Sequence, residues 1–210
     1  MRRFWILLGL MVMPFMAWAS DNVATLWLLE KPVHLVREGR VLEVKAQETE
    51  LQNGDQVETG FEGKAKIHFD NGDLVYLGPA STVKVQAEQT QRILNISLNL
   101  TGKLRALVNH RSNRSFKVRT VNAIVGVKGT DFVTEIINNQ TRVGTLKGLV
   151  ALQSVKTGGT VDIPAGKESA ISPSGKVMPL REIAGDILSG VEIAGRQLGL
   201  DESAGEKVSP

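Results

Sequence analysis

The residues with the clearest chemical potential in this chain are basic. Residues 89–130 contain eight lysines and arginines and no aspartate or glutamate. Within this block Lys103 and Arg105 alternate with apolar residues, as do Lys117 and Arg119. On strands, each pair would therefore project from one face while its neighbours enter a core. Clustered cations attract an anionic partner, more weakly as salt concentration rises. We predict binding contacts from Arg105, Lys117, Arg119 and Lys128.

A second interpretation of the same block needs no ligand. Charge runs often form ordinary solvated faces, and residues 20–88 hold 12 acidic and 7 basic side chains that the cations could oppose within the molecule. The whole chain carries 25 basic and 22 acidic residues. Removing a leader that contains Arg2 and Arg3 leaves 23 against 22. This near balance, the expected export and the lack of interleaved exposed aromatic residues disfavour nucleic acid as a partner.

Catalytic chemistry finds little support in the sequence. The three histidines, His34, His68 and His110, do not share a metal-binding spacing, and there is no cysteine. No GxSxG or HExxH motif is present. We therefore predict no catalytic residue, no metal site and no cofactor. The alternative, an enzyme acting on cell-wall glycans, would require paired carboxylates in a cleft, for which Asp131 and Glu135 are the candidates.

The stretch VNAIVGVKGTDFVTEI, residues 121–136, holds two glycines three positions apart. Such a loop could bind a phosphate if it led into a helix, whose N–H groups would face the anion. The residues that follow alternate instead, with Phe132, Thr134 and Ile136 on one side, which is the pattern of a strand. We therefore predict a structural corner made by Gly126, Gly129, Thr130, Asp131 and Phe132.

Most of the chain between Val33 and about Ile171 has the pattern of short strands separated by turns. In KAKIHF, residues 64–69, the apolar side chains share one face. The following Asn71-Gly72 pair is typical of a type I′ hairpin turn into LVYLG. We predict a second hairpin between residues 92–100 and 103–108, and an Asn-rich turn at 138–140. The spacing predicts an all-β fold, either a jelly-roll-like sandwich or a short β-solenoid, with about 10 to 14 short strands.

The C-terminal region changes period. Apolar residues from Leu180 onward recur at three- and four-residue steps, as in Ile183, Ile187 and Val191, which predicts an amphipathic helix over residues 180–200. Internal glycines weaken such a helix, so it would be stable only when docked. It could cap one end of the β core or dock a partner, and its mixed charges argue against membrane binding. Residues 201–210 are predicted to form a disordered tail.

The N-terminus has the three-part pattern of a secretory signal peptide. Arg2 and Arg3 precede an apolar run from Phe4 to Ala19, which at 16 residues is short for a membrane-spanning helix. The small residues around Trp18 predict cleavage after Ala19, and retention as an uncleaved anchor is the alternative. No later segment is long and apolar enough to suggest a membrane span. The expected location is the periplasm.

Several of these segments together resemble the FecR domain family. AIVGVKGTDFVTEI is similar to the family's V-x-G-V-R-G-T-x-F signature, with Lys128 where the family usually has Arg. NGDQVETG and GKAKIHFDNGDLVYLGPASTVKV are similar to its earlier motifs, and TRVGTLKGLVALQS and IPAGKESAIS to its later ones. The resemblance covers residues 54–171. It implies a mostly β domain of the bacterial envelope, in a family whose name-giving members sense an occupied siderophore transporter and control a sigma factor.

With this resemblance, the chain is expected to divide into five parts. These are a signal peptide (1–19), an N-terminal β segment packing on the main domain (20–53), a FecR-like β domain (54–179), the C-terminal helix (180–200) and the tail (201–210). We expect no cytoplasmic region that could contact a sigma factor. The predicted function is a non-enzymatic sensing or binding domain that takes an envelope protein or an anionic ligand, such as a chelate or a glycan. A structural scaffold with a partner-docking C-terminal helix is the alternative.

Overall fold

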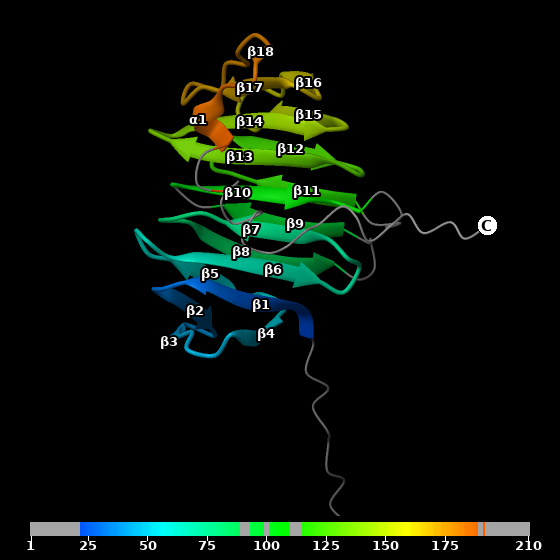
Figure 1. Ribbon diagram of the computed structural model, residues 1–210. Helices are drawn as coiled ribbons and strands as arrows, with labels where there is room; N and C mark the ends of the chain where they lie inside the picture. Colours follow the sequence, from blue (N-terminus) through cyan, green and yellow to red (C-terminus); the bar gives the residue numbers. More distant parts are fainter. Residues whose placement is uncertain (1–21, 89–92, 99–100, 110–114, 189–190, 192–210) are drawn as a thin grey trace, which may run out of the picture.

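The computed structural model describes residues 22–88, 93–98, 101–109, 115–188 and 191. Its strands form two nine-stranded sheets that face each other across one core (Figure 1). Sheet A contains β1 (Asn22–Glu30), β4 (Glu48–Gln52), β6 (Lys64–Phe69), β7 (Leu74–Leu77), β10 (Gly102–Leu107), β13 (Asp131–Ile137), β14 (Gln140–Lys147), β17 (Lys167–Ile171) and β18 (Arg181–Glu182). Sheet B contains β2 (Val33–Arg37), β3 (Arg40–Glu43), β5 (Gln56–Thr59), β8 (Thr82–Glu88), β9 (Ile93–Leu98), β11 (Ser115–Arg119), β12 (Ala123–Val127), β15 (Leu149–Ser154) and β16 (Thr160–Pro164).

The order of strands in each sheet follows the order of the chain almost throughout. Sheet A runs β4-β1-β6-β7-β10-β13-β14-β17-β18, and sheet B runs β3-β2-β5-β8-β9-β11-β12-β15-β16. Neighbouring strands are antiparallel except for β9 and β11, which are parallel. The strands therefore stack along one axis, with β3 and β4 at one end and β16 and β18 at the other (Figure 1). The predicted all-β fold is confirmed, in the form of two facing sheets.

The described residues form 18 strands, more than the predicted 10 to 14, because long β-type segments change sheets part way along. Gly148 is the clearest example: it separates β14 in sheet A from β15 in sheet B and has φ +86°. A Cβ at this position would lie 2.9 Å from Thr130 Cγ2 and 3.0 Å from the Gly129 carbonyl oxygen. Positive φ and close packing both favour glycine here, so the chain turns a corner at this point.

The core lies between the two sheets and is built mainly by alternation along the strands. On β6, for example, Ala65, Ile67 and Phe69 point inward and are buried. Phe116 from sheet B and Phe132 from sheet A meet edge to face, with ring centroids 6.2 Å apart. Because the inward positions fill the core, the polar and charged residues between them are left to the two outer faces.

The predicted hairpin of β6 and β7 is confirmed, but its turn is not type I′. Only Gly72 has positive φ there, +85°, and its N–H donates to the carbonyl of Phe69. The buried carboxylate of Asp73 accepts hydrogen bonds from the Asn71 side chain and from the backbone N–H of Asn109. These bonds hold a longer loop than the two-residue turn that the Asn-Gly pair suggested.

The predicted second hairpin is wrong. β9 pairs with β8 and β11 in sheet B, whereas β10 pairs with β7 and β13 in sheet A. Gly102, with φ +130°, lies at the start of β10, and a Cβ there would be 2.7 Å from Ser81. The glycine thus belongs to a crossing between sheets. The Asn-rich turn, in contrast, is confirmed as a hairpin of β13 and β14, with positive φ at Asn138 and Asn139.

The C-terminal segment differs from the predicted helix at its start. Arg181 and Glu182 form β18, which pairs with β17, and within the described part of the segment only Gly185–Leu188 (α1) is helical. The predicted boundary is wrong because the spacing of apolar residues from Leu180 fits a helix. In the structure, the chain instead first adds the short strand β18 to sheet A. The remainder of the predicted helix, apart from Val191, lies outside the described residues, as do the leader and the tail.

Candidate functional site

Three cations project from the outer face of sheet B. Lys84 on β8 lies between the buried Val83 and Val85, and β11 has the same alternation around its two basic residues. Inward valines and phenylalanine therefore force the basic side chains to the solvent side. We call this surface the cationic face, made by Lys84, Lys117 and Arg119.

The strand register fixes the spacing of the cationic face. Lys84 is paired with Ser97 of β9, and Ser97 with Arg119 of β11. Lys84 and Arg119 therefore lie in one row across the sheet, and their Cα atoms are two strand spacings, or about 10 Å, apart. Lys117 lies two residues from Arg119 along β11, about 7 Å away. The three charges form a triangle on a pleated surface.

The cations of this face make no ion pair with any residue in the described part of the chain. The register places glycine and uncharged residues beside them: Lys117 is opposite Gly126, and Arg119 is opposite Ile124. On the same face, Glu58 accepts a hydrogen bond from Gln56 and Asp162 is exposed on β16. The positive charge is thus left available to an external partner.

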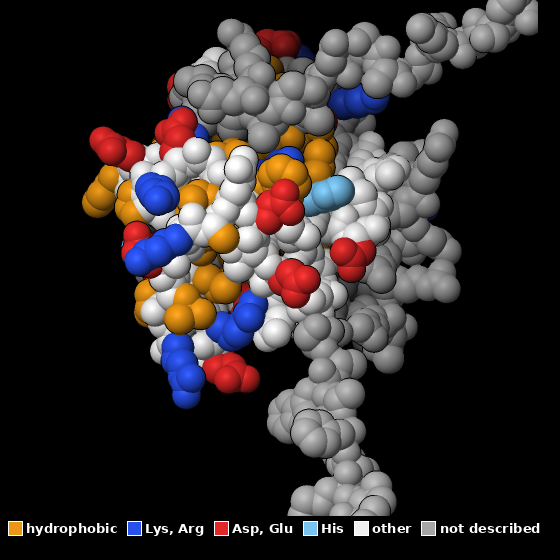
Figure 2. Space-filling model, turned by 60° about the horizontal axis from the view of Figure 1, so that its bottom comes forward, with side chains coloured by type: hydrophobic (Ala, Val, Ile, Leu, Met, Phe, Trp, Pro, Cys, Tyr) orange, Lys and Arg blue, Asp and Glu red, His pale blue; other side chains and the backbone are white. Residues whose placement is uncertain are grey.

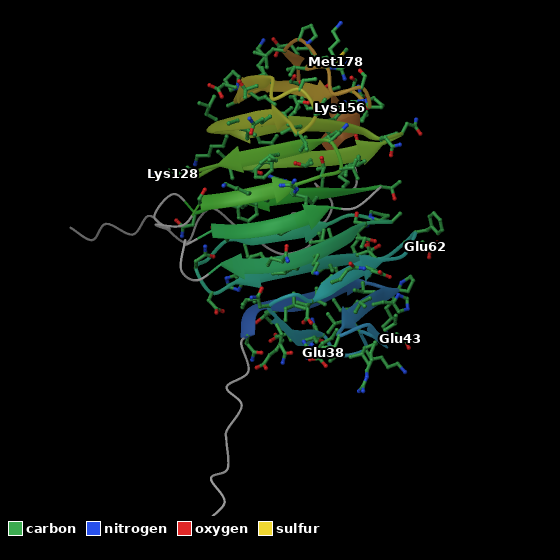
Figure 3. All side chains as sticks on the ribbon, turned by 180° about the vertical axis from the view of Figure 1, so that it is seen from behind. Glu38, Glu43, Glu62, Lys128, Lys156 and Met178 are labelled. Carbon is green, nitrogen blue, oxygen red and sulfur yellow. The ribbon has the colours of Figure 1, made fainter. Side chains whose placement is uncertain are left out.

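The structure separates the four residues predicted to bind. Arg119 is exposed and Lys117 half-buried on the cationic face, whereas Arg105 is on the opposite outer face, that of sheet A. Lys128 is exposed at the side of the stack, in the connection from β12 to β13 (Figure 3). Sequence reasoning missed Lys84 because it lies in a segment with an excess of acids. The alternation in TVKVQAE was the available signal.

The outer face of sheet A pairs its charges internally. Arg105 forms a fork with Asp131, Nε to Oδ1 at 2.9 Å and Nη2 to Oδ2 at 2.7 Å. Lys103 Nζ lies 2.8 Å from Glu135 Oε1. Because Asp131 and Glu135 each face a cation, they are engaged in ion pairs instead of facing a common cleft. We call this surface the paired face.

Arg142 is the centre of the paired face. Its guanidinium contacts Glu135 at 3.3 Å, Glu168 at 3.2 Å and Asp186 at 2.8 Å, and Glu168 is almost fully buried. Hydrogen bonding to Asp186, together with Glu168, raises the pKa of Arg142 despite its burial. The bond from Arg142 in turn lowers the pKa of Asp186 to about 2. Both charges are stabilised in the folded protein.

The C-terminal segment lies across the paired face. Ile187 and Val191 are buried against Val133 of β13, with Ile183 beside them. A Cβ on Gly144 would lie 2.7 Å from Ile183 Cδ1, so this glycine makes room for the segment. Ile183, Ile187 and Val191 therefore pack inside the molecule and are not available to a partner.

The glycine-containing motif connects the two sheets. Gly129 has φ +68° between β12 of sheet B and β13 of sheet A, whereas Gly126 lies within β12. Thr130 is buried and its carbonyl accepts the Val108 N–H. Asp131 holds Arg105, and Phe132 enters the core. The motif therefore forms the connection by which the chain passes from sheet B to sheet A.

The described residues contain no group of three or more potential metal-ligating side chains of the His, Cys, Asp and Glu types. Within them no helix is long and apolar enough to cross a membrane.

Comparison with known proteins agrees with the sequence motifs. Residues 55–151 match the family model described as "FecR protein", as the motifs predicted. The fold is similar to two crystal structures, at 2.50 and 1.65 Å resolution, described as a "putative anti-sigma factor" from Parabacteroides distasonis. Each has 15% sequence identity and a TM-score of 0.55 over 69% of this chain. The match spans 64% and 65% of those chains, just under two thirds of their length. No curated protein matches the sequence.

Proposed function

We propose that this protein is a periplasmic, non-enzymatic regulatory module whose cationic face binds an acidic surface of another envelope protein. The FecR domain and the anti-sigma-factor structures support a regulatory role in signal transduction. The signal-peptide pattern of residues 1–19 supports export. The observation that carries the binding proposal is the group of three cations, Lys84, Lys117 and Arg119, without an ion-pair partner among the described residues.

The shape of the surface favours a protein over a small chelate. Small-molecule sites are concave and enclose most of their ligand, whereas these cations project from the outer side of a sheet. A complementary acidic surface would be attracted by the summed field, and binding would weaken as salt screens the charges. An anionic glycan chain is the second candidate, since a polyanion could also span charges about 7 to 10 Å apart.

Charge reversal tests the proposal in the native envelope. A photoreactive residue at Gln153, which is paired with Ile124 near Arg119, would crosslink a protein bound to this face. We expect the crosslinked product to disappear in the Lys117→Glu/Arg119→Glu variant. The matched control is Lys147→Glu/Lys176→Glu, which changes the net charge equally at two exposed lysines away from this face.

The readout is the crosslinked band, with circular dichroism to show that both variants fold. Loss of the band only in the cationic-face variant supports the proposal. An equally strong band in both variants, or equal loss in both, contradicts it. A product that glycosidases return to the size of the uncrosslinked chain would assign the face to a glycan.

A further inference from the structure

A second interaction surface lies at the free edge of sheet B. β3 is the terminal strand of that sheet and pairs with β2 only. All four of its residues are exposed, including Val41 at 64% and Leu42 at 49%. Figure 2 turns this end of the molecule toward the reader and shows hydrophobic side chains among acidic and basic ones. A free edge with exposed apolar residues is a template for another strand.

The hydrogen-bonding groups of this edge can be assigned from the register. Val44 N–H donates to the Val33 carbonyl, so Val33 and Val44 form a hydrogen-bonded pair between β2 and the chain that follows β3. Antiparallel pairs alternate between hydrogen-bonded and non-hydrogen-bonded. The next hydrogen-bonded pairs are then Leu35 with Leu42 and Arg37 with Arg40. The N–H and C=O groups of Val41 and Glu43 consequently point to the free edge.

A second copy of the chain is a poor match for this edge. When two β3 strands pair about a two-fold axis, hydrogen-bonded pairs can form only between residues whose N–H and C=O groups point to the free edge. Val41 would then lie opposite Glu43, or one of these two residues would lie opposite its own copy. No such register puts Arg40 opposite Glu43. Glu48 and Glu50 on β4, the edge of sheet A at the same end, would also approach their own copies. Like charges directly opposite each other are destabilising.

An independent extended segment has no such restriction. Antiparallel to β3, it would place one residue opposite each of Glu43, Leu42, Val41 and Arg40 in turn. A complementary segment would carry a basic, an apolar, an apolar and an acidic residue at these positions, in that order. Opposite charges and apolar pairs stabilise cross-strand neighbours. Figure 3 shows Glu43 at this end of the stack, and its carboxylate contacts Lys45 at 3.2 Å with both side chains largely exposed. Exposed pairs of this kind are weak and exchangeable.

We infer that β3 is a strand-addition site for an extended segment of another protein with the pattern basic-apolar-apolar-acidic. The other edges are protected in the ways natural sheets use. β18 has two residues, β4 carries Glu48 and Glu50, and β16 carries Asp162 and ends at Pro164. The site is separate from the cationic face, because it uses backbone groups at the edge of sheet B instead of side chains on its surface.

A short peptide tests the inference on the purified chain. The probe is acetyl-Thr-Lys-Val-Val-Glu-Thr-amide, whose lysine would lie opposite Glu43 and whose second valine would lie opposite Val41. At saturating peptide, we expect amide hydrogen exchange of Val41 and Glu43 to slow about tenfold, as for a newly protected strand. Exchange at Leu42, which is already bonded to β2, should change little. The measurement is exchange by nuclear magnetic resonance.

Matched peptides separate strand pairing from simple contact. N-methylation of the second valine removes an N–H that would bond to Val41, so protection should be lost. N-methylation of the first valine removes an N–H that points away, so protection should remain. In the protein, Val41→Pro should abolish protection while Val41→Ala should retain part of it, and the peptide pair decides the matter if Val41→Pro fails to fold.

Three results would overturn the inference. The first is unchanged exchange at Val41 and Glu43 with saturating peptide. The second is equal protection by a peptide with its lysine and glutamate interchanged. The third is protection of both amides that rises with protein concentration in the absence of peptide, which would assign the edge to a second copy.

Discussion

The two outer faces of this sandwich differ in whether their basic residues form ion pairs within the protein. Both are built from alternating strands that send every second residue to the solvent side, and both carry basic residues from one acid-free block of sequence. On the paired face Lys103, Arg105 and Arg142 each meet a carboxylate, and the C-terminal segment covers part of the surface. On the cationic face none of the three cations does so among the described residues. A basic run in sequence is therefore a candidate binding surface only where the neighbouring strands leave its charges unpaired.

The largest expected difference between the faces is in stability. Arg142→Met would leave the buried Glu168 and Glu135 with fewer partners, at a cost of about 3 kcal/mol in the free energy of unfolding. The matched Arg119→Met change on the cationic face should cost no more than about 0.5 kcal/mol. Urea denaturation of both variants measures this. Equal losses would contradict the assignment of the two faces.

Removing the covering segment tests whether it is a cap. A chain that ends at Pro179 loses the buried Ile187 and Val191, and we expect a loss of about 2 kcal/mol after the entropy of ordering is subtracted. Thermal denaturation would show this as a lower midpoint. Unchanged stability together with a lost envelope partner would instead identify a docking segment.

The crossing between the two sheets provides a third test. Gly129→Val places a β-branched residue at φ +68° and should cost about 1–2 kcal/mol or more. Gly126→Val is the control, since Gly126 lies within β12 without positive φ and a Cβ there would meet only the Ala151 carbonyl at 4.0 Å. A melting midpoint that falls equally for both would show that the corner has been placed wrongly.

The smallest expected effect is a pH dependence confined to the paired face. The folded pKa of Asp186, about 2, lies below its ordinary value of 3.8, so its ion pair with Arg142 stabilises the fold above about pH 4. That contribution should be lost as pH falls through 2. Asp186→Asn should remove this part of the pH dependence of unfolding and leave the cationic face unaffected. An identical profile for variant and parent would contradict the coupling.

Local patterns predicted most of the elements, and two of the exceptions share one cause. Alternation identified the strands, and the glycine-containing signature identified the FecR domain. The second hairpin was mispredicted because Thr101-Gly102 has the composition of a turn whether the chain returns within a sheet or crosses to the other. The same ambiguity hid the separation of Arg105 from Arg119. Sequence shows which side of its own strand a residue occupies, but pairing between distant strands decides which sheet that strand joins.

The chain-ordered stacking of strands has a consequence for how the molecule loses structure. Most strands contact only strands that are close to them in the sequence. In repeat proteins with this property, the stability is approximately a sum of the interactions between neighbouring units. Fraying can therefore begin at either end of the stack and stop part way, while the middle around β10 and β13 keeps its pairing. Anything that clamps the outermost strands of such a stack also slows its loss from that end.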